Sequence, residues 1–280
     1  MSLHFPAAPS VSLWSSFIKR GAWKGELPRI EAVADTIPTD AAAYARVCGF
    51  SHADPLPLTW PGVATIGLQL AVMTSPAFPL PVAGIVHTRQ QITRRRHVRA
   101  GEVLSARCVV DGHRVVRAGG EFDMVVEVSS GGAIVWEGIT TILTRGIRGH
   151  GGEREPTEAA PLKVTRSTRW RLPADQGRRY AAVSGDYNPI HLSPWTSRPF
   201  GFPKPIAHGW WTLARALAEL DTDVPEACTV DVRFVSPVSL PGTVTFEAGK
   251  REEGPREGAE GLAFEVSGKK LCLVGSVRGG

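Results

Sequence analysis

Cysteine is scarce in this 280-residue chain, and its few cysteines are not arranged to bind metal or to form a disulfide framework. They lie far apart, in apolar or strand-like stretches: Cys48, Cys108, Cys228 and Cys272. Four histidines also lack metal-ligand spacing, among themselves and with the cysteines: His52, His87, His113 and His150. We therefore expect reduced core cysteines in a cytoplasmic protein, and no metal site.

The chain also has only a small excess of positive over negative charge. The formal net charge is +5 and the isoelectric point is near 9.2, with the basic residues spread along the chain. This excess is too weak to indicate a nucleic-acid partner, and we expect none. It is compatible with an anionic ligand, such as a nucleotide-bearing carrier or an acidic carrier protein.

Charged residues are absent from one long segment, residues 55–86. The segment is too broken for a membrane span, because Pro76, Pro79 and Pro81 interrupt it and leave an apolar helix at about residues 61–73. Such a helix is shorter than the ~20 residues that a span needs. The N-terminus has no basic run before an apolar stretch. We therefore expect neither a signal peptide nor a membrane span.

The chain contains an internal duplicate. Residues 44–50 (YARVCGF) match residues 180–186 (YAAVSGD) without gaps, at an offset of 180 − 44 = 136. Each copy follows a proline and a short polar stretch, and each precedes a strongly apolar helix. We expect these helices at about 61–73 and 209–220. The match predicts two halves of the same architecture.

Strand patterns follow each apolar helix. Residues 86–89 resemble 230–233, and residues 99–103 resemble 240–244. Alternation of branched and aromatic residues predicts further strands at 121–128, 133–143, 261–266 and 270–277. A sheet that covers a helix apolar on all sides has to curl around it. We therefore predict an α+β fold, a double hotdog in which two antiparallel sheets each wrap a long buried helix.

Composition divides the chain into two domains. Residues 146–161 are rich in Gly, Glu and Pro and have almost nothing to bury, which is typical of a linker. We expect an N-terminal hotdog at 1–145 and a C-terminal hotdog with the active site at 162–280. The two would pair edge to edge as an internal pseudo-dimer, which either suffices as a monomer or pairs again into a homodimer.

The second copy runs into a segment that is suited to bend, SGDYNPIH at residues 184–191. Gly185 permits backbone angles that other residues resist, and the proline after Asn188 holds that residue out of the helical region. Asp186 and His191 are five residues apart, so only an irregular loop brings carboxylate and imidazole together. An Asp and a His differ in intrinsic pKa, about 4 against 6.5, which suits adding or removing water across a polarised double bond. Asn188 would orient the water or a catalytic group.

Residues 180–191 (YAAVSGDYNPIH) resemble the signature of the MaoC and type 2 enoyl-CoA hydratase family, and PIAHG at 205–209 strengthens the resemblance. It is clear from about residue 163 to 220 and weak in the remaining strands. The length of two hotdogs also resembles that of the actinobacterial double-hotdog dehydratases, including the mycobacterial fatty-acid enzymes. The family implies that Asp186 and His191 form the catalytic pair and that the Gly209 amide binds the thioester carbonyl. The first amides of a helix have no internal partner and lie at the positive end of its dipole, so they suit that role.

The first copy lacks the motif. At the same offset it has Phe50, His52 and Pro55 in place of the aspartate, asparagine and histidine of the second copy. Neither a phenyl ring nor a proline transfers a proton. We therefore expect the first half to be catalytically inactive, and to serve as a structural mate and as a wall of the substrate tunnel.

Five residues near the motif are candidates to contact the acyl thioester: Ser184, Tyr187, Phe200, Phe202 and His208. The two phenylalanines lie with Trp195 in a proline-rich run that either lines the acyl pocket or is an ordinary packed loop. His208 either contacts substrate or only shapes the turn before the helix. The basic run at 94–97 either holds a carrier phosphate or partner protein or is a solvated turn.

The expected activity is reversible hydration of a trans-2-enoyl thioester to the (R)-3-hydroxyacyl thioester in fatty-acid metabolism. The substrate would be carried by coenzyme A or by acyl carrier protein, and no cofactor would be consumed. The (R) preference rests wholly on the family resemblance. Two alternatives stay open, namely thioester hydrolysis by another hotdog enzyme, with water aimed at the carbonyl carbon, and a non-catalytic acyl-thioester-binding subunit.

Overall fold

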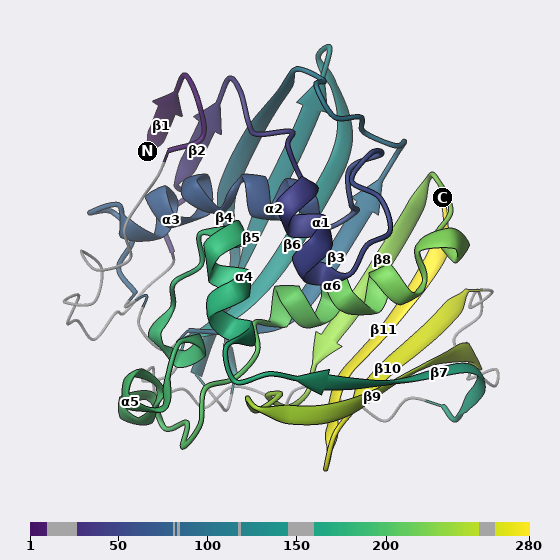
Figure 1. The fold of residues 1–280 in the computed structure, drawn as a ribbon. Coiled ribbons are helices and arrows are strands. Elements are labelled where there is room, and N and C mark those ends of the chain that lie inside the picture. Colours follow the sequence, from purple (N-terminus) through teal and green to yellow (C-terminus); the bar gives the residue numbers. More distant parts are fainter. Residues whose placement is uncertain (10–26, 81, 83–84, 117–118, 145–159, 252–260) are drawn as a thin grey trace.

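The strands form one curved sheet of 11 strands in a computed structural model that describes residues 1–9, 27–80, 82, 85–116, 119–144, 160–251 and 261–280 (Figure 1). The strands of the first half are β1 (Ser2–Phe5), β2 (Glu31–Ala34), β3 (Val86–Arg94), β4 (Leu104–Val116), β5 (Gly119–Ser130) and β6 (Ala133–Thr144). Those of the second half are β7 (Leu162–Leu172), β8 (Cys228–Phe234), β9 (Gly242–Arg251), β10 (Leu262–Ser267) and β11 (Leu271–Gly279).

In each half the helices come before the innermost strand, which is β3 in the first half and β8 in the second. The α-helices are α1 (Ala42–Cys48), α2 (Trp60–Ala64), α3 (Ile66–Thr74), α4 (Gln176–Ser184), α5 (Pro194–Ser197) and α6 (Gly209–Glu219). Short 3₁₀ turns lie at Pro189–His191, Arg198–Phe200 and Asp221–Asp223. Among the described residues, no helix is long and apolar enough to cross a membrane.

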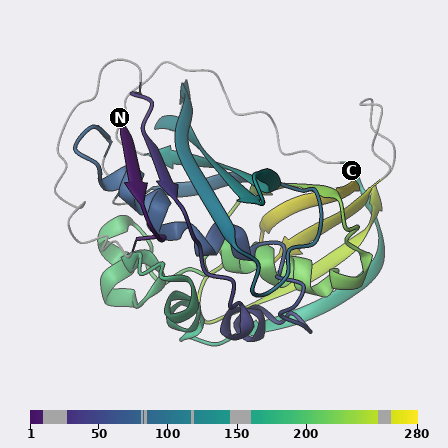
Figure 2. The same ribbon diagram turned by 90° about the horizontal axis from the view of Figure 1, so that it is seen from above.

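The two halves of the sheet have the same strand order. From the outside inwards the first half reads β2, β4, β5, β6, β3 and the second reads β7, β9, β10, β11, β8, while β1 is added parallel to β2 at the edge. The halves join through the antiparallel pair β3 and β8, whose register runs from Arg89 opposite Arg233 to Arg94 opposite Cys228. The predicted double hotdog is confirmed, and its two half-sheets form one continuous sheet. The N-terminus lies at the β1 edge of the sheet, and the C-terminus lies in the second half, after the inner strand β11 (Figures 1 and 2).

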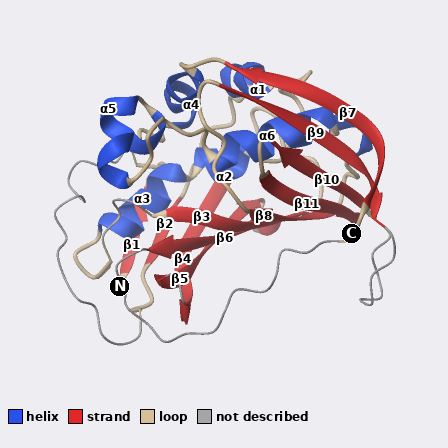
Figure 3. Ribbon diagram, turned by 90° about the horizontal axis from the view of Figure 1, so that it is seen from below, coloured by secondary structure: helices blue, strands red, loops and turns tan. Residues whose placement is uncertain are grey.

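The helices gather on the concave side of the sheet, and β7 and β9 arc around α6 (Figure 3). This helix begins at Gly209 and ends at Glu219, one residue short of the predicted range. Six of its residues are buried: Trp211, Thr212, Leu213, Ala214, Ala216 and Leu217. Burial of apolar side chains at this density explains why the sheet curls around the helix instead of lying flat on it.

The apolar helix of the first half is broken, whereas one helix at 61–73 was predicted. It forms α2 and α3, with Thr65 between them. The Thr65 hydroxyl donates to the carbonyls of Pro61 and Gly62, at 2.9 and 3.1 Å, and Gln69 also donates to the Gly62 carbonyl at 2.9 Å. Side chains that bond back to helix carbonyls compete with the helical ladder and bend it.

The duplicated segments form equivalent helices, α1 and α4, that pack against each other. Each ends at a glycine in the left-handed region, with φ of 83° at Gly49 and 76° at Gly185. Tyr44 and Tyr180, the first residues of the two matching segments, lie with ring centroids 6.0 Å apart. The internal match in the sequence therefore corresponds to two copies that meet face to face.

Two local expectations are wrong in part. The 99–103 match to 240–244 predicted strands, but Arg99 to Glu102 form a turn with Gly101 at φ 83°, because only glycine adopts that angle readily. In the basic run 94–97, Arg94 is buried, and its guanidinium donates to the carbonyls of Pro225 and Glu226, both at 2.8 Å.

The four cysteines are free and buried, as expected. The expected linker 146–161 lies outside the described residues, except for its last two residues.

Candidate active site

A cavity of about 290 Å³ lies where the two halves meet. The second half lines it with Asp186, Asn188, His191, Phe202, Ile206, His208, Gly209 and Phe234 among others. The first half contributes mainly apolar side chains, which include Ile66, Leu70, Met73, Val82, Val86, Ile142 and Leu143. The lining is mostly apolar, with the Asp186, His191 and His208 group and a few further polar side chains, as in sites for small amphiphilic ligands.

The turn after α4 brings Asp186 and His191 together. The left-handed Gly185 ends the helix, and the Asp186 amide donates to the Ser184 hydroxyl at 3.2 Å. An Asp186 carboxylate oxygen accepts from the Asn188 amide at 3.1 Å, and the Asn188 side chain caps the following 3₁₀ turn by accepting from the Ile190 amide at 3.4 Å. These side chain to backbone bonds are typical of Asp and Asn in turns. They produce the irregular loop that the spacing of the two residues requires.

His191 is held as a neutral imidazole. Its Nδ1 lies 2.7 Å from the carbonyl oxygen of Ile206, so this nitrogen donates a proton and Nε2 carries the lone pair. The side chain is buried at 7% exposure, and burial lowers its pKa below the ordinary 6.5. A neutral imidazole that lines the cavity and has an unprotonated Nε2 is suited to accept a proton.

Gly209 is the first residue of α6 and lines the cavity. Its amide belongs to the first turn of the helix, where amides have no partner inside the helix. The ring of Phe234 packs closely here, so that a Cβ on residue 209 would meet ring carbons at 3.2 to 3.4 Å. Glycine therefore lets an aromatic ring and a ligand approach the helix terminus together.

His208 contacts both members of the expected pair. Its Nε2 lies 3.0 Å from the Asp186 carbonyl oxygen, and its ring stacks on that of His191, with centroids 3.7 Å apart and an interplanar angle of 27°. Its Nε2 is also 3.8 Å from an Asp186 carboxylate oxygen. One carboxylate oxygen of Asp186 and one ring nitrogen each of His191 and His208, atoms of the kind that bind metal ions, all lie within 4.8 Å of one another. The three residues are therefore one cluster, in which the His208 nitrogen nearest the carboxylate is occupied as a donor to a carbonyl.

The other expected substrate contacts divide into two groups. Phe202 lines the cavity, as do Asn188 and His208. Ser184, Tyr187 and Phe200 are outside its lining. The Ser184 hydroxyl bonds the Asp186 amide instead, and Tyr187 is 53% exposed.

His87 on β3 is a lining residue that the sequence did not single out for this site. It lies at a bulge in the pairing of β3 with β6, between His87 and Arg89. Its ring packs on Phe234 with centroids 4.4 Å apart, its Nε2 donates to the Arg89 carbonyl at 3.0 Å, and burial lowers its pKa to about 4. Bulges re-aim side chains and are common beside active sites. A lone histidine in a strand carries no such signal in the sequence.

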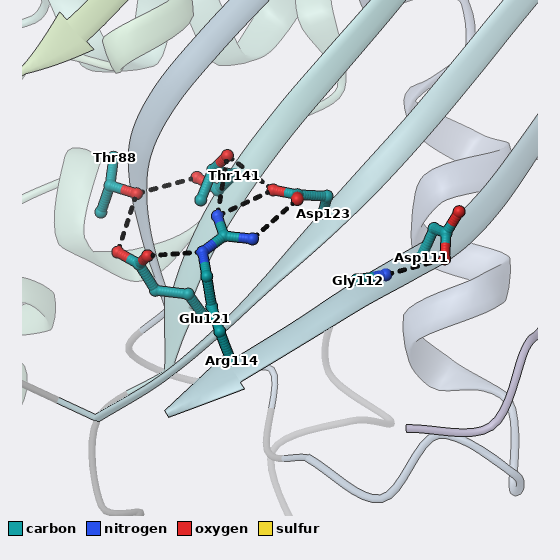
Figure 4. A network of polar contacts seen from close by, with 7 residues as sticks. All are labelled: Thr88, Asp111, Gly112, Arg114, Glu121, Asp123 and Thr141. Carbon is teal, nitrogen blue, oxygen red and sulfur yellow. Dashed lines mark hydrogen bonds and ion pairs between the residues drawn. The ribbon is translucent and has the colours of Figure 1, made fainter. Parts of the chain in front are cut away.

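A polar network adjoins this bulge (Figure 4). Thr88, the extra residue, donates to the Thr141 carbonyl at 3.2 Å and approaches Glu121 at 3.5 Å. Arg114 pairs with Glu121 at 3.2 Å and with Asp123 at 2.8 Å. The network joins β3, β4, β5 and β6, and so it fixes the first-half wall of the cavity at His87 and Thr88.

The first-copy equivalents of the expected catalytic residues lie elsewhere. Phe50, His52 and Pro55 line a separate cavity of about 250 Å³, together with Arg94 and Asp221. Phe50, at the position equivalent to Asp186, is 9% exposed. At the position of the first copy that corresponds to Asp186, the chain therefore has a buried phenyl ring and no carboxylate.

Similarity to known proteins agrees with this geometry. Residues 151–266 match the family described as MaoC like domain, and residues 31–130 match the FAS1-like, dehydratase domain region. The 3-hydroxyacyl-thioester dehydratase X of Mycobacterium tuberculosis is 34% identical over 233 residues, which cover 82% of this chain and 83% of that protein. The chain belongs to the MaoC-like dehydratase family.

Other relatives of this MaoC-like chain are consistent with the assignment. The crystal structure of HtdX from Mycobacterium tuberculosis superposes with a TM-score of 0.75 at 31% identity, covering 89% of this chain and 99% of that one. A MaoC-like dehydratase from Phytophthora capsici, at 20% identity and a TM-score of 0.67, covers 90% and 96% and shares the fold. A protein of Dictyostelium discoideum named probable enoyl-CoA hydratase 2 is 29% identical over 61% of this chain and 56% of its own length.

Proposed function

We propose that this MaoC-like protein catalyses the reversible hydration of a trans-2-enoyl thioester to the (R)-3-hydroxyacyl thioester in fatty-acid metabolism. The single observation that carries the proposal is the convergence of Asp186, His191 and Gly209 on one cavity whose lining is mostly apolar. The family membership and the names of the relatives support the reaction. The (R) preference rests on the resemblance of residues 180–191 to the type 2 enoyl-CoA hydratases. The acyl chain would occupy the apolar part of the cavity.

The chemistry needs one water and two proton transfers. In the hydration direction the water oxygen bonds to the β-carbon, a proton leaves that water for a base, and the α-carbon gains a proton. Asp186 and His191 hold the water between them and carry out the transfers, and the free Nε2 of His191 is suited to accept the water's proton. The Gly209 amide donates to the thioester oxygen, which gains negative charge as the β-carbon is attacked.

The first half would act as a structural mate and a wall of the acyl site. Its apolar residues on α3 and β6 line the cavity, and Phe50 replaces the catalytic carboxylate in the first copy. The domain boundaries at 145 and 162 remain part of this proposal. So do coenzyme A or acyl carrier protein as the carrier, and a monomeric pseudo-dimer or a homodimer as the assembly.

Loss of enoyl-thioester absorbance tests the function directly. Purified protein would be mixed with crotonyl-CoA, and separately with a long-chain trans-2-enoyl-CoA, and compared with Asp186→Asn and His191→Gln. We expect each substitution to lower kcat by about 10²- to 10⁴-fold, the usual contribution of a positioned proton-transfer group. His52→Gln, an exposed substitution at the first-copy position equivalent to Asn188, is the matched control and should keep full activity.

Three results would contradict the proposal. Full activity in both Asp186→Asn and His191→Gln would show that these two residues are not the proton-transfer groups. Release of free thiol without loss of the double bond would make the protein a thioesterase. Tight binding of a saturated acyl-CoA without turnover of any enoyl thioester, whether on coenzyme A or on acyl carrier protein, would make it a binding subunit.

A further inference from the structure

The His208 side chain is buried and packs against the rings of His191 and Tyr180. One face stacks on His191 with centroids 3.7 Å apart, and Tyr180 packs at 4.7 Å with its ring tilted by 51°. The residue is 2% exposed. Its backbone is fixed as well, because its carbonyl accepts from the amide and the hydroxyl of Thr212 at 3.0 and 3.1 Å. The ring therefore has little freedom to move.

The hydrogen-bonding state of His208 follows from its partners. Nε2 faces the Asp186 carbonyl oxygen at 3.0 Å, so it carries a hydrogen and donates. Nδ1 is buried and has no hydrogen-bond partner among the described residues. Burial, with the neighbouring His191, lowers the pKa of His208 to about 3. A second proton would have to sit on the buried Nδ1 without an acceptor, so His208 stays neutral while the enzyme works and does not carry protons itself.

We propose that His208 is a positioning residue for the hydration reaction, which holds the Asp186 backbone through its Nε2–H and the His191 imidazole through ring stacking. This role rests on the proposed function of Asp186 and His191. One ring contacts both proton-transfer residues, Asp186 through its backbone carbonyl and His191 through its imidazole, and it belongs to the residue immediately before Gly209. Carboxylate, imidazole and amide are thereby tied to the same helix terminus. A displacement of about 1 Å in such an arrangement can cost on the order of 10²-fold in rate.

The support for His208 extends into the first half of the chain. Behind Tyr180 lies Tyr44 at 6.0 Å, and behind Tyr44 lies Trp60 at 5.3 Å. These rings form a chain of pairwise contacts from Trp60 on α2 to His191, in which His208 is the link to the proposed catalytic residues. The inactive half therefore contributes to catalysis by fixing His208, in addition to lining the cavity.

Two substitutions separate the two contacts of His208. His208→Gln keeps a side-chain N–H donor and removes the aromatic face. His208→Phe keeps a flat ring and removes the donor. Each variant, in the full chain, is assayed with crotonyl-CoA for kcat and KM per folded molecule, with its melting temperature and its affinity for saturated butyryl-CoA as further readouts. His52→Gln serves again as the control, because it is an exposed histidine away from the cluster.

We expect both variants to lose about tenfold or more in kcat, while KM and butyryl-CoA affinity change less than about threefold, since only alignment of the reacting groups is lost. A kcat within about twofold of the wild type in either folded variant would overturn the two-contact role, whatever its melting temperature. A rise in KM and in the butyryl-CoA dissociation constant at unchanged kcat would overturn it too, because His208 would then contact substrate. An inactive wild type would refute the proposed function itself, whereas activity that needs Asp186 but tolerates both variants would refute this inference alone.

Discussion

Tyr44 and Tyr180 occupy the same position in the two copies of the duplicated segment, and their rings lie 6.0 Å apart where α1 meets α4. Their hydroxyls are in different environments. Tyr44 donates to the Thr59 hydroxyl at 2.8 Å, and Tyr180 has a buried hydroxyl with no hydrogen-bond partner among the described residues. The symmetry of the duplication thus extends to the two rings but not to the hydrogen bonds of their hydroxyl groups. Tyr180 is the copy whose ring packs against His208.

This asymmetry predicts unequal effects of removing the two hydroxyls. Tyr44→Phe should lower the free energy of unfolding by about 0.5–1.5 kcal/mol, the net value of a typical hydrogen bond. Tyr180→Phe should leave it unchanged or raise it slightly, because the hydroxyl that it removes is buried without a partner. Urea unfolding of the two variants beside the wild type measures both changes. Equal destabilisation would show that the Tyr180 hydroxyl has a partner too.

Gly49 and Gly185 form a matched pair for a second prediction. Both end helices in the left-handed region, so alanine at either position should cost on the order of 1–2 kcal/mol of stability. Only Gly185 adjoins the loop of Asp186 and His191, the proposed proton-transfer residues. We therefore expect Gly185→Ala to lower kcat as well, by tenfold or more for a loop displaced by about 1 Å, while Gly49→Ala keeps the turnover of its folded fraction. Unfolding curves and enoyl-CoA kinetics on the same preparations test this, and equal kinetic losses would argue against a local effect on Asp186.

Gly209→Ala should act through Phe234. The added Cβ would meet the Phe234 ring at 3.2 to 3.4 Å, so either the ring or the helix terminus has to shift by a few tenths of an ångström. We expect kcat/KM for crotonyl-CoA to fall about tenfold or more, because a displaced amide stabilises the thioester oxygen less well. The double variant Gly209→Ala with Phe234→Leu should recover part of the loss, since it removes the ring contact. No recovery in a folded double variant would indicate that the methyl group blocks the substrate directly.

The architecture could be predicted from the sequence because the duplication is local and ordered. Residues 44–50 and 180–186 became α1 and α4 with glycine caps in equivalent conformations, and the helix expected at 209–220 formed at Gly209–Glu219. The break at Thr65 was not predicted, because it depends on a threonine hydroxyl that bonds to helix carbonyls instead of to solvent. Burial of Arg94 was missed because its acceptors, the carbonyls of Pro225 and Glu226, lie in the other half of the chain.

The candidate site divides in a similar way. Asp186, Asn188 and His191 stand in one continuous motif, so local sequence was enough to group them. The contacts of His208 with Asp186 and His191, and the presence of His87 in the cavity, join segments 17 or more residues apart in the chain. No periodicity or spacing encodes such contacts, and they appear only once the two halves are paired.

Stability should fall as the pH drops from about 7 towards 4, because the folded protein keeps several imidazoles neutral. Burial lowers the pKa of His191, lowers that of His87 to about 4 and lowers that of His208 to about 3. In the unfolded chain these groups have pKa values near 6.5 and take up protons first. Keeping these imidazoles neutral in the folded protein therefore has no effect on the free energy of unfolding above about pH 6.5. Below that pH the free energy of unfolding decreases until the pKa of each group in the folded protein is reached.

The urea midpoint measured at intervals between pH 7 and pH 4.5 tests this prediction, and His87→Gln should have a shallower slope because one of these groups is removed. Glu102→Gln is the matched control. Arg96 holds the pKa of Glu102 at about 2, so this carboxylate loses its contribution only below the ordinary glutamate pKa of about 4.3. The control should therefore lower stability without changing the slope above pH 5. A flat midpoint from pH 7 to pH 4.5 in the wild type would mean that the buried imidazoles are protonated in the folded protein, and it would also remove the basis for a neutral His191 as the proton acceptor.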